Sequence, residues 1–358
     1  MKKIIVAVTL GIALIAWSCA KVDTGNSGLR QSVEKGVADI NHAVSSISGT
    51  TGYLLLTVSD NVTKSDFVFN DTINMKMVAG IYDFQPDTLI RFHNFSPYRL
   101  FKKTGESENM VVNLPEMLVM HPRHLLFFNM KDTVYPNNFT ITATDYHLYF
   151  NWWHSYEYKL TAGLTLNNEN AGSLDVSSTS TSQHSNSYSS SYTFKDGYHI
   201  GTTWQDGDTA TSSFYLNQSS DTLFRETSTF IWHYNQENMC MMHHGNNAER
   251  LYDLTIGNVE VKKSAGIDSI QVFVGGVLQK HAAQITTDQS DTTASICHKR
   301  DVLLTYDDGT TAKLSELLAP VKEQLKTLRD SLRSMYFSKH IIDYIAYSIY
   351  FESHPFNY

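Results

Sequence analysis

The sequence lacks the local motifs that mark the commonest enzyme families. It contains no Gly-x-Ser-x-Gly, no His-Glu-x-x-His, no phosphate-binding glycine loop and no dinucleotide fingerprint. A glycosidase leaves no such pattern, because its two carboxylates come from distant strands. We therefore expect a non-enzymatic protein that needs no cofactor, with a glycoside hydrolase of dispersed carboxylates as the alternative.

Clustered positive charge is also missing. The 358 residues carry 28 Lys and Arg against 36 Asp and Glu, a formal net charge of −8, and the basic residues form no run. Phosphate binding requires clustered Lys and Arg, so nucleic acid is excluded as an expected partner. Charged residues make up only 18% of the chain, while Ser, Thr, Asn and Tyr are abundant. This composition is typical of exported β proteins.

No apolar run is long enough for a permanent membrane-spanning helix, which needs about 20 residues. The fourteen residues Ile4 to Trp17 follow Lys2 and Lys3 and precede the small residue Ser18. A basic start, a short apolar run and a small residue form a secretion signal. We expect residues 1–18 to be removed, which takes away two lysines and leaves a net charge of 26 minus 36, or −10.

Cysteine is rare, and each of the three cysteines has an expected role. The string Ala16-Trp17-Ser18-Cys19 resembles a bacterial lipobox, which implies that Cys19 becomes the N-terminus and carries lipid. Several acyl chains anchor a soluble domain firmly, and an ordinary signal peptide cleaved near Ala20 is the alternative. Cys240 and Cys297 then remain in an oxidising compartment, which predicts a disulfide between them. Two separately buried thiols are the alternative.

The length indicates either two domains or one large sheet structure with additions, because a single hydrophobic core stops growing at about 250 to 300 residues, and we expect two domains. We expect a mainly β protein with antiparallel β-sandwich or barrel-like sheets and one amphipathic helix near the C-terminus. The predicted segments are a signal peptide at 1–18, a lipidated tether with a short helix at 19–50, an N-terminal β domain at 51–165, a C-terminal β-meander domain at 166–310, and a helix with a final strand at 311–358.

Residue pairs that contain glycine recur between the predicted strands in the second half of the chain. Asp196-Gly197, Asp206-Gly207, Gly257-Asn258, Gly275-Gly276 and Asp308-Gly309 separate strand-like runs, and such pairs favour tight hairpin turns. A Ser-, Thr- and Asn-rich tract at 167–191 precedes them. It fits either a disordered linker or the solvent-facing strands of an antiparallel sheet.

Near the C-terminus the hydrophobic period changes to that of a helix. Apolar residues recur at steps of three and four, which is the stripe of an amphipathic helix: Leu314, Leu317, Val321, Leu325, Leu328, Leu332 and Met335. The apolar runs at 53–58 and 341–351 are predicted as strands, the second narrowly in preference to a helix.

An aromatic run is the strongest candidate for ligand binding. Exposed aromatic rings stack on sugars, whereas buried rings belong to the core. The adjacent Trp152 and Trp153 cannot both face inward on a regular strand, so we expect one to be exposed. The sequence thus predicts a glycan or surface-ligand site at Trp152, Trp153, Tyr156 and Tyr158, with core packing as the alternative.

A metal site is not expected. The segment Met239-Cys240-Met241-Met242-His243-His244 has the soft ligands that suit copper(I). However, methionine commonly fills gaps in cores, the cysteine is predicted to be bridged, and adjacent histidines on a strand point to opposite faces.

A repeated short pattern, Asp followed by Ser or Thr and then by an aliphatic residue or Thr, resembles the O-glycosylation sequon of exported proteins of the Bacteroides group. The acceptors that this resemblance implies are Thr72, Thr88, Thr133, Thr209, Thr222, Ser269 and Thr292, although strand-opening turns also generate such triplets. Ser331 fits the pattern within the predicted helix and is the least expected acceptor.

Together, the lipobox, the sequons and the Ser/Thr/Tyr-rich strands resemble outer-membrane lipoproteins of the Bacteroides group (Bacteroidota). The resemblance implies a cell-envelope protein that is held to the outer membrane by lipid and faces the periplasm or the cell surface. Its expected partners are the membrane and a glycan or another envelope protein. A purely structural or assembly lipoprotein is the remaining alternative.

Overall fold

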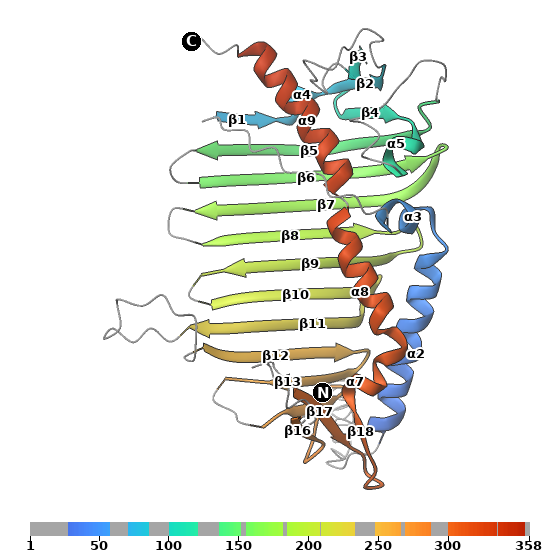
Figure 1. The fold of residues 1–358 in the computed structure, drawn as a ribbon, viewed down its shortest axis with the longest axis vertical. Helices are drawn as coiled ribbons and strands as arrows, with labels where there is room; N and C mark the ends of the chain where they lie inside the picture. The colour runs from blue at the N-terminus through green and yellow to red at the C-terminus, as the bar shows by residue number, and fades with distance from the viewer. Residues whose placement is uncertain are drawn as a thin grey trace, which may run out of the picture.

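The computed structural model describes residues 28–57, 71–85, 100–120, 136–151, 155–181, 185–207, 209–232, 248–265, 269–287, 300–334 and 336–354. Over these ranges the chain is mainly β, as the sequence predicts, with a helix near the C-terminus. Fifteen strands form one long open sheet, and three more form a small sheet at one end (Figure 1).

The large sheet is mostly a meander. From β5 to β15, each strand pairs antiparallel with the next strand in the chain, while β4 extends the sheet on the other side of β5 and pairs parallel with β2. Its strands are β1 (Asp71–Asn74), β2 (Gly80–Phe84), β3 (Phe101–Gly105), β4 (Met110–Leu114), β5 (Phe139–Asn151), β6 (Ser155–Leu166), β7 (Glu169–Thr181), β8 (Asn186–Thr193), β9 (Tyr198–Asp206), β10 (Thr209–Gln218), β11 (Asp221–Trp232), β12 (Ala248–Ile256), β13 (Val259–Lys263), β14 (Gln271–Val274) and β15 (Val277–Gln279). The small sheet contains β16 (Ala283–Thr287), β17 (Arg300–Thr305) and β18 (Thr311–Lys313).

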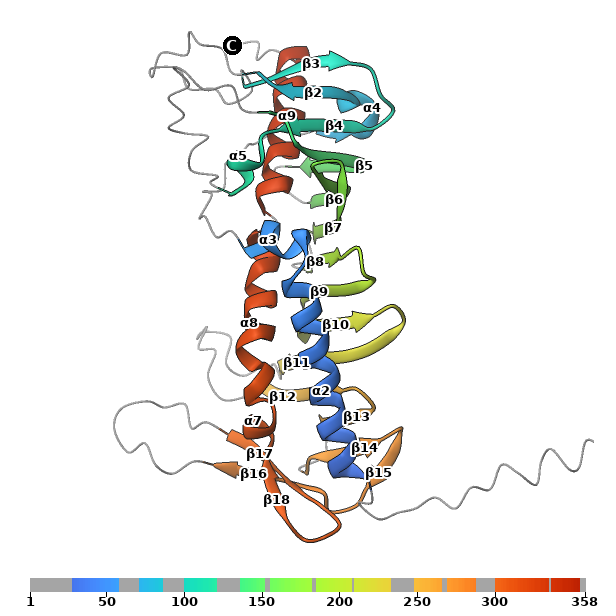
Figure 2. The same cartoon turned by 90° about the vertical axis from the view of Figure 1, so that its right-hand side faces the viewer.

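Helices cover one face of the large sheet. The described helices are α2 (Leu29–Ser48), α3 (Thr51–Thr57), α4 (Met75–Val78), α5 (Glu116–Met120), α7 (Leu314–Leu317), α8 (Ala319–Ser334) and α9 (Tyr336–Ser353), of which α7 contacts the small sheet. Figure 2 shows α2, α8 and α9 on the same side of the sheet, running across the strands. Leu328 of α8, Ile40 of α2 and Leu216 of β10 are fully buried, so the core lies between this helical layer and the sheet.

The predicted turns are confirmed. Gly197, Gly257, Gly275 and Gly309 all have positive φ angles at the hairpins where the sequence places them. Glycine adopts this left-handed backbone without the steric cost that a side chain would add. The tight turns allow consecutive strands to lie side by side in the sheet.

The Ser-, Thr- and Asn-rich tract forms strands β7 and β8, which confirms the second of its two interpretations. Leu174 and Val176 face the helices and are buried, whereas Asp175 and Ser177, which alternate with them, are exposed. One face of these strands therefore belongs to the core and the other is polar. The turn before β7 is made by Asn167 and Asn168, both with positive φ.

Two strand predictions are wrong, because residues 53–58 and 341–351 were expected to be extended. The first overlaps helix α3 and the second lies within helix α9. A short apolar run fits a buried strand or a buried helix equally well, so periodicity does not separate them. In α9 the buried Ile341, Ile345 and Ala346 follow helical spacing. The predictions of a short helix within residues 19–50 and of an amphipathic helix after residue 314 are confirmed by α2 and α8.

The large sheet continues through residue 165. The predicted boundary near this residue falls at the end of β6, and β6 pairs with β7 along its whole length, from Ser155 opposite Thr181 to Leu166 opposite Glu169. The strands on both sides of the boundary thus belong to one sheet.

Candidate functional site

The predicted aromatic site lies at the hairpin between β5 and β6. Trp152 and Trp153 lie outside the described residues. Tyr156 is half-buried, and its ring stacks parallel to that of Tyr158 at 6.5 Å between centroids. Tyr158 is only 3% exposed. The structure thus brings two of the four predicted residues together, and one of these is in the core.

Tyr158 belongs to a buried polar cluster that joins α9 to the sheet. Its hydroxyl donates to the Asp343 carboxylate at 3.0 Å, and the Tyr146 hydroxyl donates to the same oxygen at 3.2 Å. Lys339 forms an ion pair with Asp343, and its ammonium lies 4.1 Å from the centre of the Tyr158 ring. Burial, and then the charge of Asp343, raises the pKa of both tyrosines well above the usual value. These hydroxyls therefore stay protonated and hold the helix in place.

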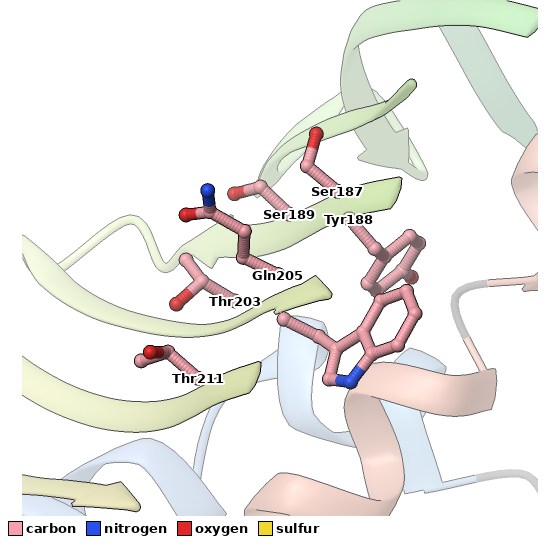
Figure 3. Close-up of a pocket in the computed structure, with 7 residues that line it drawn as sticks. Ser187, Tyr188, Ser189, Thr203, Gln205 and Thr211 are labelled. Carbon is pink, nitrogen blue, oxygen red and sulfur yellow. The ribbon is translucent and has the colours of Figure 1, made fainter. Parts of the chain in front are cut away.

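A shallow pocket of about 240 Å³ lies on strands β8, β9 and β10. Its lining residues are Ser187, Tyr188, Ser189, Thr203, Trp204, Gln205 and Thr211. Figure 3 shows the Ser, Thr and Gln side chains on one side of the sheet and the ring of Tyr188 on the other. The pocket opens on the polar side, and none of its seven lining residues carries a charge.

The polar side of the pocket belongs to two rows of hydroxyl-bearing side chains that cross five strands, β7 to β11. The pairing registers place one row at Ser177, Ser189, Thr203, Ser213 and Thr227, and the other, in which one member is a glutamine, at Thr179, Ser187, Gln205, Thr211 and Thr229. Several of these groups bond to one another: Thr179 contacts Ser187 at 2.7 Å and Thr227 donates to Ser213 at 3.1 Å. The rows form an ordered, uncharged polar surface.

On the opposite side of the same strands, Tyr188 and Trp204 form an aromatic pair. They are directly opposite each other in the β8–β9 register, so their side chains share the face that carries the helices. Trp204 is 41% exposed and Tyr188 is partly exposed, whereas Tyr192 and Ile200, farther along the same strands, are fully buried. The pair therefore lies where the strands extend beyond the helical layer.

The neighbours of this aromatic pair are small. Ser178 of β7 is opposite Tyr188, and Ser212 of β10 is opposite Trp204. Serine side chains are too short to cover an adjacent indole or phenol ring. Exposed aromatic surface of this kind on a soluble domain often marks a binding site.

Sequence reasoning did not identify Trp204 as a site residue, because its segment reads simply as one strand of the meander. A signal was present, since Trp204 alternates with the polar Thr203 and Gln205 and is followed closely by the Asp206-Gly207 turn. These features place Trp204 near the end of a strand, but they do not show whether a helix covers it.

The other predicted site residues are distributed over the molecule. Among the proposed glycosylation acceptors, Thr209 and Ser269 are exposed, Thr72 and Thr222 are partly exposed, and Thr88, Thr133 and Thr292 lie outside the described residues. Ser331 is 6% exposed and bonds to the backbone of α8. Cys19, Cys240 and Cys297 also lie outside the described residues, as does the Met239–His244 segment.

Within the described ranges, no three or more His, Cys, Asp or Glu side chains come together as a possible metal site. The described helices include none that is both long and apolar enough to cross a bilayer.

Comparisons with known proteins gave no match. No family model fits the chain, and neither the curated proteins nor the solved structures contain a significantly similar one.

Proposed function

We propose that this chain is a lipid-anchored cell-envelope protein that binds glycan without enzymatic activity, through the aromatic pair of Tyr188 and Trp204. The observation that carries the proposal is the 41% exposure of Trp204, which lies directly opposite a second aromatic residue on the neighbouring strand. An aromatic ring stacks on the apolar face of a sugar, and two neighbouring rings offer contacts to successive sugars of a chain.

The surroundings of the pair support a saccharide better than an apolar ligand. Ser178, Ser212 and Asn186 lie next to the rings on the same face and supply hydroxyl and amide groups for the hydroxyls of a sugar. Binding sites typically combine such apolar surface with a few placed polar groups. Ser178, Ser212 and Asn186 are uncharged, which favours a neutral glycan, although the Asp206 carboxylate lies opposite Asn186 on the same face.

The envelope location rests on the sequence. The lipobox-like string before Cys19, the secretion signal and the acidic net charge agree with export and lipid attachment. Attachment to the outer membrane, facing the periplasm or the surface, is part of the same proposal, as is O-glycosylation at exposed acceptors such as Thr209 and Ser269. Cys240 and Cys297 are proposed to form a disulfide.

A non-enzymatic role fits the site better than glycoside hydrolysis. A hydrolase needs two carboxyl groups about 5 to 10 Å apart across a bound sugar. On the face of the aromatic pair, the carboxylate of Asp206, two residues from Trp204, accepts a hydrogen bond from the Gly207 backbone, and the Asp343 carboxylate is buried among tyrosines beneath α9.

A glycan array probed with the purified mature protein tests this proposal. We expect binding to at least one family of neutral glycans, and we expect Trp204→Ala to weaken that binding at least tenfold. Leu278→Ala is the matched control, because Leu278 is 38% exposed on edge strand β15, away from the site. Equal binding by the parent and Trp204→Ala would refute the site, and no glycan binding by the parent would refute the function.

A further inference from the structure

The ring of Tyr215 lies flat on the face of the sheet that carries no described helix. Tyr215 of β10 is directly opposite Gly201 of β9. A Cβ atom at Gly201 would overlap the Oη, Cζ and Cε1 atoms of the Tyr215 ring. Only glycine leaves the space that this ring occupies, so the ring rests across β9 with one side against the backbone. Its half-buried state agrees with this arrangement.

The imidazole ring of His199 lies next to the Tyr215 ring. The imidazole of His199 lies 5.3 Å from the Tyr215 ring, centroid to centroid, with 73° between the ring planes. Because Tyr215 lies along the sheet, His199 projects nearly upright from it. The two rings are nearly perpendicular on the polar face, and both residues are partly exposed.

Side chains that can form hydrogen bonds lie next to the rings of Tyr215 and His199. The Tyr215 hydroxyl is hydrogen-bonded to Ser191, which fixes the ring in the plane of the sheet. Asp175 is exposed and close enough to act electrostatically on both Tyr215 and His199, and it accepts a hydrogen bond from Thr161 at 2.7 Å. Arg225 is exposed and directly opposite Tyr215 on the other side. An acceptor and a donor therefore flank the ring.

We propose that Tyr215 and His199 form a second saccharide-binding site, on the opposite face of the sheet from Tyr188 and Trp204. A flat ring open on one side stacks on the apolar face of a pyranose, and the upright imidazole limits where the sugar lies. Asp175 accepts hydrogen bonds from sugar hydroxyls and Arg225 donates to sugar oxygens. This combination of one flat platform and two opposed polar groups fits a pyranose better than a peptide or an apolar ligand.

The polar pocket continues this site along the strands. Ser189 and Thr203, which line the pocket, are two residues from Ser191 and Gly201 on the same strands and the same face. Two residues of a strand span about 7 Å. A chain that places one sugar on Tyr215 therefore brings its next sugar over the pocket hydroxyls, and the site selects oligosaccharides over monosaccharides.

This inference rests on glycan binding as the function of the protein, and a set of variants separates the two. Parent, Trp204→Ala, Tyr215→Ala and the double variant are titrated with chitohexaose, cellohexaose and maltohexaose, and with the glycan that binds best on the array. We expect Trp204→Ala to retain weaker binding and the double variant to lose at least tenfold more. Tyr149→Ala is the matched control, because this partly exposed tyrosine lies on the same face of β5.

Gly201→Ala provides a second test that keeps both rings. Its added methyl group displaces the Tyr215 ring from the sheet, so we expect the same loss as for Tyr215→Ala, while Tyr215→Phe keeps the platform and most of the affinity. Unchanged binding by Tyr215→Ala and Gly201→Ala, together with a loss in Trp204→Ala, would overturn the second site alone. A parent protein that binds no glycan would overturn both proposals.

Discussion

Asp343 is the buried charge on which the attachment of α9 depends. It is 9% exposed, accepts hydrogen bonds from Tyr146 and Tyr158, and pairs with Lys339 one helical turn away. The tyrosine hydroxyls satisfy the carboxylate without introducing a second buried charge. Removing one member of such a cluster lowers the free energy of unfolding by more than the whole cluster contributes to it, because the remaining polar groups stay buried without a partner.

We expect Asp343→Ala to lower the free energy of unfolding by about 3 kcal/mol. Asp39→Ala is the matched control, because Asp39 also pairs with a lysine one turn away, Lys35, but at the surface of α2. An exposed pair of this kind contributes well under about 1 kcal/mol. Urea unfolding of the two variants checks the prediction, and equal losses would contradict the role of the cluster.

Two histidines make stability depend on pH. Burial lowers the pKa of His199 and of His340 from the usual value, although Asp175 and Asp343 respectively act in the opposite direction and Lys339 adds to the lowering at His340. Between the folded pKa and the unfolded value near 6.5, the unfolded chain binds more protons. Stability is therefore complete above about pH 6.5 and falls as the pH drops through that value toward the folded pKa.

The measurement is the urea midpoint at pH 7.5 and pH 5.5. We expect the parent to lose stability at pH 5.5, and we expect the double variant His199→Gln, His340→Gln to lose less over the same interval. If the double variant loses as much as the parent, other groups control the acid sensitivity.

At the scale of elements, the strands and turns of the meander were predictable, and the helices that flank them were predictable only in part. Asp196-Gly197 and Gly275-Gly276 specify hairpins locally, so the sequence places these turns correctly. The stripe from Leu314 to Leu332 specifies a helix because one of its faces is polar. The segment at 341–351 has no polar face, because Asp343 and Ser348 are its only residues that are neither aliphatic nor aromatic, and both are buried. Only tertiary packing decides its structure.

The same limit applies to the candidate site. Alternation within β9 indicates that Trp204 and Thr203 lie on opposite faces, but the exposure of Trp204 depends on where α8 and α9 cross the sheet, which no local pattern encodes. Likewise, Tyr158 is predicted as a platform because its strand is aromatic, and its contact with Asp343 joins residues 185 positions apart. Contacts at such separations are set by the whole fold.

Helix α2 lies directly against β12 at Gly36. A Cβ atom at this position would lie 2.7 Å from Ile256 Cγ2 and 2.9 Å from the Ile256 carbonyl oxygen. Because backbone atoms cannot move aside, we expect Gly36→Ala to destabilise the protein by about 1 to 3 kcal/mol, despite the gain in helix propensity of up to about 1 kcal/mol.

Gly163→Ala in β6 is the control for this prediction, because its added methyl group would meet no atom within 4 Å. We expect that variant to unfold at the parent's denaturant concentration or slightly higher. A Gly36→Ala variant as stable as the parent would show that α2 shifts freely on the sheet.

At the scale of the whole molecule, the sheet is long and one layer thick, with helices on one face. Fourteen strands lie side by side in the sheet from β15 to β3. The thirteen distances between neighbouring strands, about 4.8 Å each, give the sheet a length of roughly 60 Å. Helix α2 begins at the β17–β18 end, where Arg30 pairs with Asp308 and lies over the Tyr306 ring. Only nine residues separate Leu29 from Cys19. A lipid on Cys19 would therefore hold one end of the sheet near the bilayer.

If residues 1–18 are removed and Cys19 carries lipid, as we propose, the anchored molecule should stand away from the membrane, because the resulting net charge of −10 disfavours contact with anionic lipid. Neutron reflectometry of the lipidated protein on a supported anionic bilayer should show a protein layer at least about 60 Å thick. A layer of half that thickness would mean that the sheet lies on the surface, and Cys19→Ser should abolish the layer altogether.

The central claim, that a glycan stacks on the indole of Trp204, is tested most directly by the indole N–H resonances of the mature protein. After removal of residues 1–18, four tryptophans remain: Trp152, Trp153, Trp204 and Trp232. In a ¹⁵N-tryptophan-labelled sample, Trp204→Phe identifies the Trp204 resonance by its loss. Titration with the glycan that binds best on the array should shift this resonance saturably. If only the other indole resonances shift, or none does, glycan does not bind at Trp204.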